Sequence, residues 1–372
     1  MSILKSTLLF GATFLFSILG IELFLQTAEI DLSYHELHPR LGKKIQADKR
    51  IIMIKEGLYM GRSNSYGYLG PDYGPDKPVD VYRIALMGDS YAEGFQLFEQ
   101  YHFRSILERE LAASTGRKIE VLNFGSGNFN FHDMHLYYRN FAQGFHPDLV
   151  LYVVKPESFA ERDNYFIPSP YFKLEQDRLT IDYSFTEQGT FKSYTRFKWL
   201  FENSSLLKMA QNAYKLASKG RTPVIVFDKF YKAIYYTEAN KTDPEEVVED
   251  PEITPVTEAI LDEIGAEGKS IFLYRKRYSE SLKDYIASQQ IPAIDLNDTL
   301  DVLMASGVHP RYWQASNKKG HWNHAAHLAI GHYLAHRLAP RVMGLVEPPL
   351  RLPETLPAVD TTATDSSLSV QP

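Results

Sequence analysis

The chain has 372 residues, 44% of them hydrophobic, which is enough to bury a full core in one large domain or two. Its formal net charge of −6 argues against general nucleic-acid binding, because such binding normally needs a basic patch. Cysteine is absent, which excludes a cysteine nucleophile, cysteine-ligated zinc and disulfides. That absence is compatible with either the cytosol or the periplasm.

An apolar run near the amino terminus predicts a membrane anchor. Residues 6–25 are apolar except for Ser, Thr and Glu22, and Lys5 precedes them. About 20 residues suit a bilayer span, and Lys5 favours an amino terminus inside and export of the rest. Residues 26–28 do not form a small-x-small cleavage site, so we expect an uncleaved signal anchor over 1–26, with a cleaved signal peptide as the alternative.

This anchor predicts a single-pass inner-membrane protein whose following domain is periplasmic or extracellular. Glu22 is unusual inside a span. It is expected either near the far interface or in contact with a membrane partner.

The next segment carries few signals of regular structure. Residues 27–63 have mixed charge and no long period, so we interpret 27–80 as a stalk and lead-in. Residues 64–71 are turn-rich and form either part of that lead-in or a simple surface loop.

A catalytic domain is predicted over 81–345, because apolar strands alternate with amphipathic helices there. This alternation favours a parallel sheet covered on both faces. The expected strands are 83–87, 119–124, 148–154, 270–274 and 292–296, and the expected helices are 103–114, 132–143, 256–266, 278–288 and 325–338.

Residues 163–250 interrupt the alternation and are rich in Tyr and Phe, as a lid or substrate wall would be. The remaining chain, 346–372, is of low complexity and expected to be disordered. Within the interruption we expect an irregular segment at 165–172, a hairpin near 179–184, a helix at 204–219 and an acidic loop at 243–255.

The first strand ends in Gly88-Asp89-Ser90. This turn leaves a serine hydroxyl at the carboxyl end of a strand and near a helix amino terminus, where N–H groups stabilise negative charge. Gly-Asp-Ser is also ordinary turn chemistry, so a nucleophilic role requires a histidine elsewhere. His321 precedes the last predicted helix, and its neutral imidazole can accept a proton near pH 7.

Together, residues 83–94 and 320–331 resemble the motifs of the SGNH/GDSL hydrolase family. Residues 121–127 are similar to the family's second block and 146–154 to its third strand, so the resemblance spans roughly 64–340. It implies a three-layer α/β/α, flavodoxin-like fold with a central parallel sheet and no cofactor. It also implies Ser90 as nucleophile and His321 as general base.

The same resemblance implies an oxyanion hole made by the N–H groups of Ser90 and Gly127. Asn128 or Asn130 could add a side-chain donor, and the sequence does not choose between them. Asp89, beside the nucleophile, is a further candidate site residue.

Two positions depart from the family pattern. Glu157 stands where the family has an asparagine that donates to the oxyanion. An ionised carboxylate only accepts hydrogen bonds, so Glu157 would oppose the reaction unless it is protonated or turned away. Lys318 and Lys319 stand where an aspartate would orient the imidazole. Another group must then orient His321, or the enzyme works with a Ser–His dyad.

His324 and His327 follow His321 at helical spacing, but no acidic residue accompanies them at ligand spacing, so we expect no metal site. We expect His327 to pack or hydrogen-bond behind the site.

The sequence therefore predicts an exported, membrane-anchored serine esterase or O-acyltransferase. The resemblance, together with the expected export, implies an acylated small molecule or a cell-surface polysaccharide as substrate, with acetyl as one candidate acyl group that the sequence does not fix, and nucleic acid is not an expected partner. A non-catalytic protein of this fold, which binds a glycan or supports envelope assembly, is the alternative.

Overall fold

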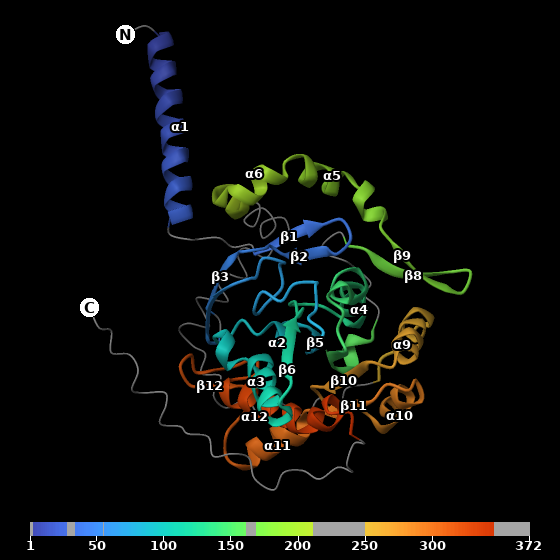
Figure 1. Ribbon diagram of the computed structural model, residues 1–372. Coiled ribbons are helices and arrows are strands. Elements are labelled where there is room, and N and C mark those ends of the chain that lie inside the picture. Colours follow the sequence, from blue (N-terminus) through green and yellow to red (C-terminus); the bar gives the residue numbers. More distant parts are fainter. Residues whose placement is uncertain (1–2, 28–33, 55, 161–168, 211–249, 346–372) are drawn as a thin grey trace.

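The computed structural model describes residues 3–27, 34–54, 56–160, 169–210 and 250–345 (Figure 1). Parts of three predicted segments, and the whole predicted tail, lie outside these residues. They are 165–168 of the irregular segment, 211–219 of the helix, 243–249 of the acidic loop, and the tail 346–372.

A sheet of five parallel strands forms the centre of the molecule, in the order β11-β10-β7-β5-β6. Numbered along the chain, this is the flavodoxin-like order 2-1-3-4-5, and ligands of such sheets bind beyond the carboxyl ends of the first and third strands. Those strands are β5 and β7 here. The strands are β5 (Val81–Gly88), β6 (Lys118–Asn123), β7 (Leu149–Val154), β10 (Ser270–Tyr274) and β11 (Ala293–Asp295).

Helices cover both faces of the sheet, which confirms the predicted three-layer α/β/α class (Figure 1). Alternate residues of β5 enter the two cores: Ala85 and Met87 pack on one side, and Ile84 and Leu86 on the other. One face carries α4 (Phe131–Asn140), α9 (Pro255–Glu267) and α10 (Glu280–Ser288), and the other carries α3 (Phe103–Thr115), α11 (Asn297–Ala305) and α12 (His324–Val342).

Each predicted strand of the central sheet is present, whereas α11 was not expected from the sequence. This helix has only nine residues, and it buries Leu300 and Leu303 while Val302 is exposed. Such a short helix shows too few turns for the 3.6-residue period to stand out.

The lead-in contains two antiparallel hairpins that the sequence analysis did not assign. They are β1 (His35–His38) with β2 (Gly42–Ile45), and β3 (Arg50–Ile54) with β4 (Leu58–Arg62). Strands of four or five residues are too short for a clear alternating pattern. A small core attaches the hairpins to the domain, and its members are Ile45, Ile51, Tyr59, Leu69 and Phe95.

Residues 64–71 form a packed turn between the hairpins and the sheet. The side-chain oxygen of Asn64 accepts hydrogen bonds from the N–H groups of Tyr66 and Tyr68, both at 3.1 Å. Tyr68 is buried, and Leu69 bridges to Asn123 at the end of β6. This turn therefore belongs to the fold and is not a simple surface loop.

The interruption after β7 contains a further hairpin, β8 (Tyr171–Glu175) with β9 (Arg178–Asp182), slightly earlier in the chain than predicted. Two helices follow, α5 (Gly189–Arg196) and α6 (Lys198–Asn203). Residues 205–210 are helical, as expected for the start of the predicted helix 204–219.

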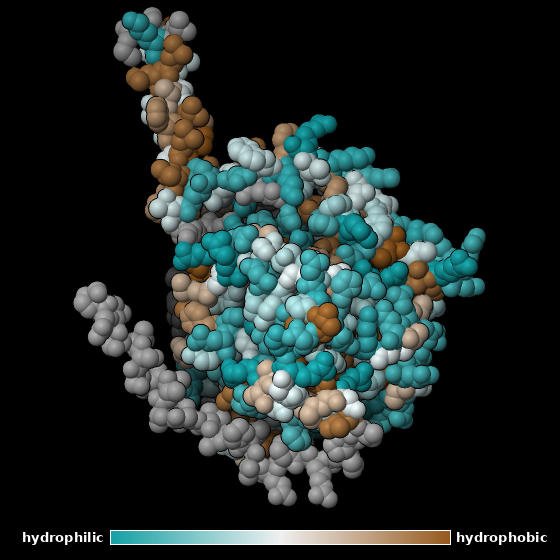
Figure 2. All heavy atoms as spheres, viewed as in Figure 1, coloured by the Kyte–Doolittle hydropathy of each residue, from teal (hydrophilic) through white to brown (hydrophobic). Residues whose placement is uncertain are grey.

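Helix α1 (Ile3–Thr27) extends away from the domain, and most of its apolar side chains are exposed (Figure 2). It is long and apolar enough to cross a membrane, a property it shares with signal sequences.

Helices α3 and α12 pack closely because Gly331 has no side chain. A Cβ atom added to Gly331 would lie 2.6 Å from the Cβ atom of Ile106. Gly331→Ala should therefore lower the free energy of unfolding by about 1–3 kcal/mol, measured by urea denaturation. Gly144→Ala is the control, because a Cβ atom there meets nothing within 4 Å. Equal stability of the two variants would contradict this account of the helix contact.

Candidate active site

The turn after β5 places Ser90 at the carboxyl edge of the sheet. Asp89 accepts a hydrogen bond from the N–H of Tyr91 at 3.0 Å and so caps the short helix α2 (Ser90–Glu93). A Cβ atom on Gly88 would lie 2.5 Å from that of Ala92, so the tight turn requires glycine there. Ser90 is consequently the first residue of a helix, as the motif predicts.

The loop before α12 brings His321 to Ser90. The Nε2 atom of His321 lies 2.8 Å from the Oγ atom of Ser90. Asn323 fixes this loop, because it caps α12 and donates to the carbonyls of His309 and Tyr312 at 2.9 and 2.8 Å. Trp313 also donates to the carbonyl of His321, at 2.9 Å. The two residues predicted to act together are therefore adjacent.

The other side of the imidazole contacts a carboxylate that the sequence analysis missed. Glu56, in the turn between β3 and β4, places Oε1 at 3.1 Å from Nδ1 of His321. An ionised carboxylate only accepts hydrogen bonds, so this contact assigns the proton to Nδ1 and leaves Nε2 to accept from Ser90. The arrangement is a Ser–His–Glu triad.

Of the two alternatives that the sequence left open, another orienting group or a Ser–His dyad, the contact of Glu56 with His321 favours the first. The acid comes from the lead-in, not from the residues before the histidine. Gly320 leaves room for it, because a Cβ atom at that position would lie 2.3 Å from Oε1 of Glu56. Lys318 and Lys319 form β13, which pairs with β12 (Tyr312–Trp313).

Gly127 lies beside the nucleophile, as expected for an oxyanion donor. A Cβ atom on Gly127 would be 3.8 Å from the Cβ atom of Ser90. Within the described residues, the N–H of Gly127 donates to no other group. The neighbouring N–H of Ser126 binds the carbonyl of Gly88 at 3.0 Å and so holds the loop against β5. The oxyanion role of Gly127 stays a prediction.

The two asparagines left open by the sequence have different surroundings. Asn130 caps α4, where its side-chain oxygen accepts from the N–H of Asp133 at 2.9 Å and its amide faces Ala160. Asn128 adopts a left-handed backbone with φ of 69° and lines the pocket beside Ser90. Asn128 is therefore the better placed of the two to contact a substrate.

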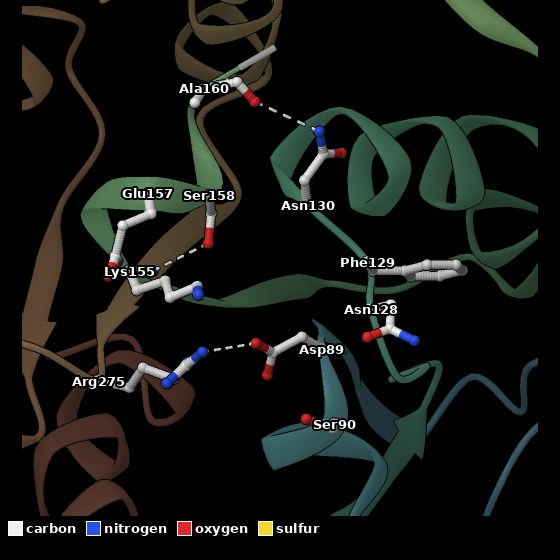
Figure 3. Close-up of a pocket in the computed structure, with 10 residues that line it drawn as sticks. All are labelled: Asp89, Ser90, Asn128, Phe129, Asn130, Lys155, Glu157, Ser158, Ala160 and Arg275. Atoms are coloured by element: carbon white, nitrogen blue, oxygen red, sulfur yellow. Dashed lines mark hydrogen bonds and ion pairs between the residues drawn. The ribbon is translucent and has the colours of Figure 1, made fainter. Parts of the chain in front are cut away.

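A mainly polar pocket of 420 Å³ opens above Ser90 (Figure 3). Besides Ser90, it is lined by Asp89, Asn128, Phe129, Asn130, Lys155, Glu157, Ser158, Ala160 and Arg275.

Glu157 is ionised and turned away from the nucleophile. Burial alone would raise its pKa, but a hydrogen bond from Lys276 and the charges of Lys155 and Lys276 lower the pKa below the usual value. Figure 3 shows the Glu157 carboxyl on the far side of the pocket from Ser90. Glu157 was expected to be either protonated or turned away from Ser90, and in the structure it is turned away.

Two cations that directly follow strands also enter the pocket. Arg275, after β10, donates to Asp89 at 2.6 Å and stacks on Tyr91 at 4.2 Å. Lys155, after β7, is half-buried, and in the part of the chain that the structure describes its ammonium group has no carboxylate within ion-pair distance. Burial, together with the charge of Arg275, lowers the pKa of Lys155. Their positions at strand ends were a signal that sequence reasoning did not use.

The remaining histidines of the motif have packing roles. His327 is buried, and its Nδ1 atom accepts from the N–H of Phe103 at 3.1 Å, behind the site as expected. Burial lowers its pKa well below the usual value and keeps it neutral. His324 contacts the rings of Tyr101 and Trp313, each edge to face.

Neither a protein-family model nor a curated protein sequence matches the chain. Solved structures do match it. A putative lipolytic protein of the G-D-S-L family from Desulfitobacterium hafniense is 12% identical with a TM-score of 0.31, over 68% of this chain and 98% of that one. Its name is that of the family the motifs of this chain resemble.

Two further matches are similarly distant. The lipase/acylhydrolase from Enterococcus faecalis is 14% identical with a TM-score of 0.35, over 73% of this chain and 100% of that one. A two-domain esterase active on acetylated mannans is 13% identical with a TM-score of 0.34, over 74% and 53% of the two chains. These values describe a distant likeness in fold only.

Glu56→Gln should lower kcat/KM for ester hydrolysis by about 10²–10⁴-fold, because the neutral amide no longer stabilises the imidazolium that forms on His321. Glu56→Ala should lower it at least as far. Steady-state kinetics on a chromogenic ester measure both effects, and the matched control is Glu280→Gln on the exposed face of α10. Full activity of both Glu56 variants would show that another group orients His321.

Proposed function

We propose that this protein is a serine esterase or O-acyltransferase of the SGNH/GDSL type. The observation that carries the proposal is the continuous line of contacts from Ser90 through His321 to Glu56. A free serine hydroxyl is a poor nucleophile, and a base oriented by a third group activates it. Nucleophilic catalysis requires such an alignment, whereas binding of a glycan does not.

The geometry supports acyl transfer in two steps. Ser90 Oγ attacks the ester carbonyl while its proton passes to Nε2 of His321, and Glu56 stabilises the resulting imidazolium. The N–H groups of Ser90 and Gly127 receive the developing oxyanion. When the intermediate collapses, His321 returns the proton to the leaving alcohol. Water or a sugar hydroxyl, deprotonated by His321, then attacks the carbonyl of the acyl-enzyme. The bond between the acyl group and Ser90 Oγ breaks, and His321 returns the proton to Oγ.

Lys155 compensates for the asparagine that the third block lacks. Its ammonium group shares the pocket with Ser90, and among the described residues no carboxylate neutralises it at close range. A cation in a partly desolvated site stabilises the negative charge that develops on the carbonyl oxygen. Lys155 would thus supply, by charge, what the asparagine supplies by a hydrogen bond.

The pocket favours a short acyl group on a polar alcohol. Phe129 and Ala160 are its apolar lining residues, and the remaining lining side chains are polar or charged. A long acyl chain would need an extended apolar surface, whereas hydroxyl-rich sugars suit convergent polar groups. With α1 as an anchor, acetyl esters on a cell-surface polysaccharide fit both the pocket and an exported domain.

The proposed activity is tested with the full-length protein in detergent. It should release p-nitrophenol from p-nitrophenyl acetate faster than from the octanoate, and Ser90→Ala should remove nearly all release, a loss of about 10³-fold or more. A fluorophosphonate probe should label Ser90. Absence of labelling together with equal rates for the two proteins would eliminate the esterase and favour the non-catalytic alternative.

Lys155→Met should lower kcat by about 10²-fold, the usual cost of removing one oxyanion-stabilising group. Lys155→Arg keeps the positive charge and should recover much of that loss. The comparison uses kcat on p-nitrophenyl acetate, whose small neutral acyl group tests the oxyanion and not substrate charge. Unchanged kcat in Lys155→Met would exclude this role.

A further inference from the structure

Glu22, the acidic residue of α1, forms hydrogen bonds with residues that are far from it in the sequence. Glu22 accepts hydrogen bonds from the hydroxyl of Ser204 at 2.9 Å and from the N–H groups of Ser205 and Leu206 at 2.8 and 3.0 Å. Gln26, one turn further, donates to the carbonyl of Asn203 at 2.9 Å. The last turns of the anchor helix are therefore joined to residues 203–206.

This junction sets the level of residues 203–206 relative to a bilayer. Glu22 lies seventeen residues after Lys5, which corresponds to about 26 Å along a helix. The hydrocarbon core is about 30 Å thick, so with Lys5 at one interface Glu22 comes within about one helical turn of the other. The segment that contacts Glu22 then lies at the membrane surface.

The helices that lead to this junction expose apolar side chains where such a surface would be. Phe197, Trp199 and Leu200 are 50%, 75% and 43% exposed. In Figure 1, α6 lies beside the domain-proximal end of α1 and α5 continues across the same side of the domain. We call residues 189–203 the juxtamembrane segment.

Other side chains of the juxtamembrane segment pack against the domain. Phe191 is buried against Phe185 with ring centroids 5.2 Å apart. Tyr194 accepts from the N–H of Leu37 at 3.3 Å, and Lys198 pairs with Glu36 at 3.0 Å. The exposed aromatic residues are thus fixed in place by the fold.

The charge of the juxtamembrane segment suits an anionic lipid surface. It contains three basic residues and one acidic residue, and Lys192 and Arg196 are exposed. Aromatic side chains are enriched at the headgroup level of membranes, and each basic residue near an anionic surface contributes about 1 kcal/mol.

We infer that the juxtamembrane segment is a lipid-binding surface. Phe197, Trp199 and Leu200 enter the headgroup layer of an anionic phospholipid bilayer, while Lys192 and Arg196 contact lipid phosphates. This inference rests on the proposed role of α1 as an anchor and is independent of the proposed chemistry at Ser90.

The three tryptophans of the chain allow a direct test. Trp199 is exposed, whereas Trp313 and Trp322 are only 4% and 2% exposed within the domain. The full-length protein is placed in nanodiscs of phosphatidylglycerol and phosphatidylcholine, with or without bromine atoms high on the acyl chains. Brominated lipid should quench up to about one third of the emission, the share of an interfacial tryptophan among three.

Trp199→Phe should abolish this quenching, and Trp313→Phe should leave it in place. Lys192→Glu combined with Arg196→Glu, or nanodiscs without phosphatidylglycerol, should reduce it. Wild-type emission that is equal in brominated and plain lipid would overturn the inference.

Failure of the anchor itself would appear differently, because the protein would then not co-elute with nanodiscs at all. A protein partner in place of lipid would leave Trp199 unquenched by bromine in these discs, and that outcome also contradicts the inference.

Discussion

The contact between the imidazole of His321 and the carboxylate of Glu56 joins parts of the chain that are 265 residues apart. It ties the lead-in hairpin β3–β4 to the loop before α12, and through His321 to the turn after β5. Closing so long a loop costs conformational entropy, which the small core around Phe95 and the packing at Gly57 and Trp313 help to offset. The alignment of the triad therefore depends on how well the lead-in packs.

The site also depends on the central sheet, because the sheet brings several loops together at one edge. In a parallel sheet the carboxyl ends of neighbouring strands meet, so Ser90 after β5, Lys155 after β7 and Arg275 after β10 reach one pocket. The pairs Arg275–Asp89 and Lys276–Glu157 neutralise charges that would otherwise be costly to bury. Among the described residues that line the pocket, Lys155 is the cation with no carboxylate within ion-pair distance.

Sequence reasoning identified the parallel sheet and the candidates Ser90 and His321, because these rest on local patterns and on motifs that follow a fixed order along the chain. It could not locate Glu56. That residue lies in a short hairpin whose strands show little periodicity, and no local feature marks a contact so distant in the chain. Asn128 and Asn130 were equivalent as residue types, and only the capping contact of Asn130 separates them.

The connection between anchor and domain has its own consequence. Seven peptide units join Thr27 to Tyr34, and at about 3.6 Å each they span at most about 25 Å. With α1 in a bilayer, this connection holds Tyr34 within about 25 Å of the end of α1 and so keeps the domain in a shell next to the membrane. The local concentration of polymers that pass through that shell, and not their concentration in bulk solution, would then govern the rate of encounter.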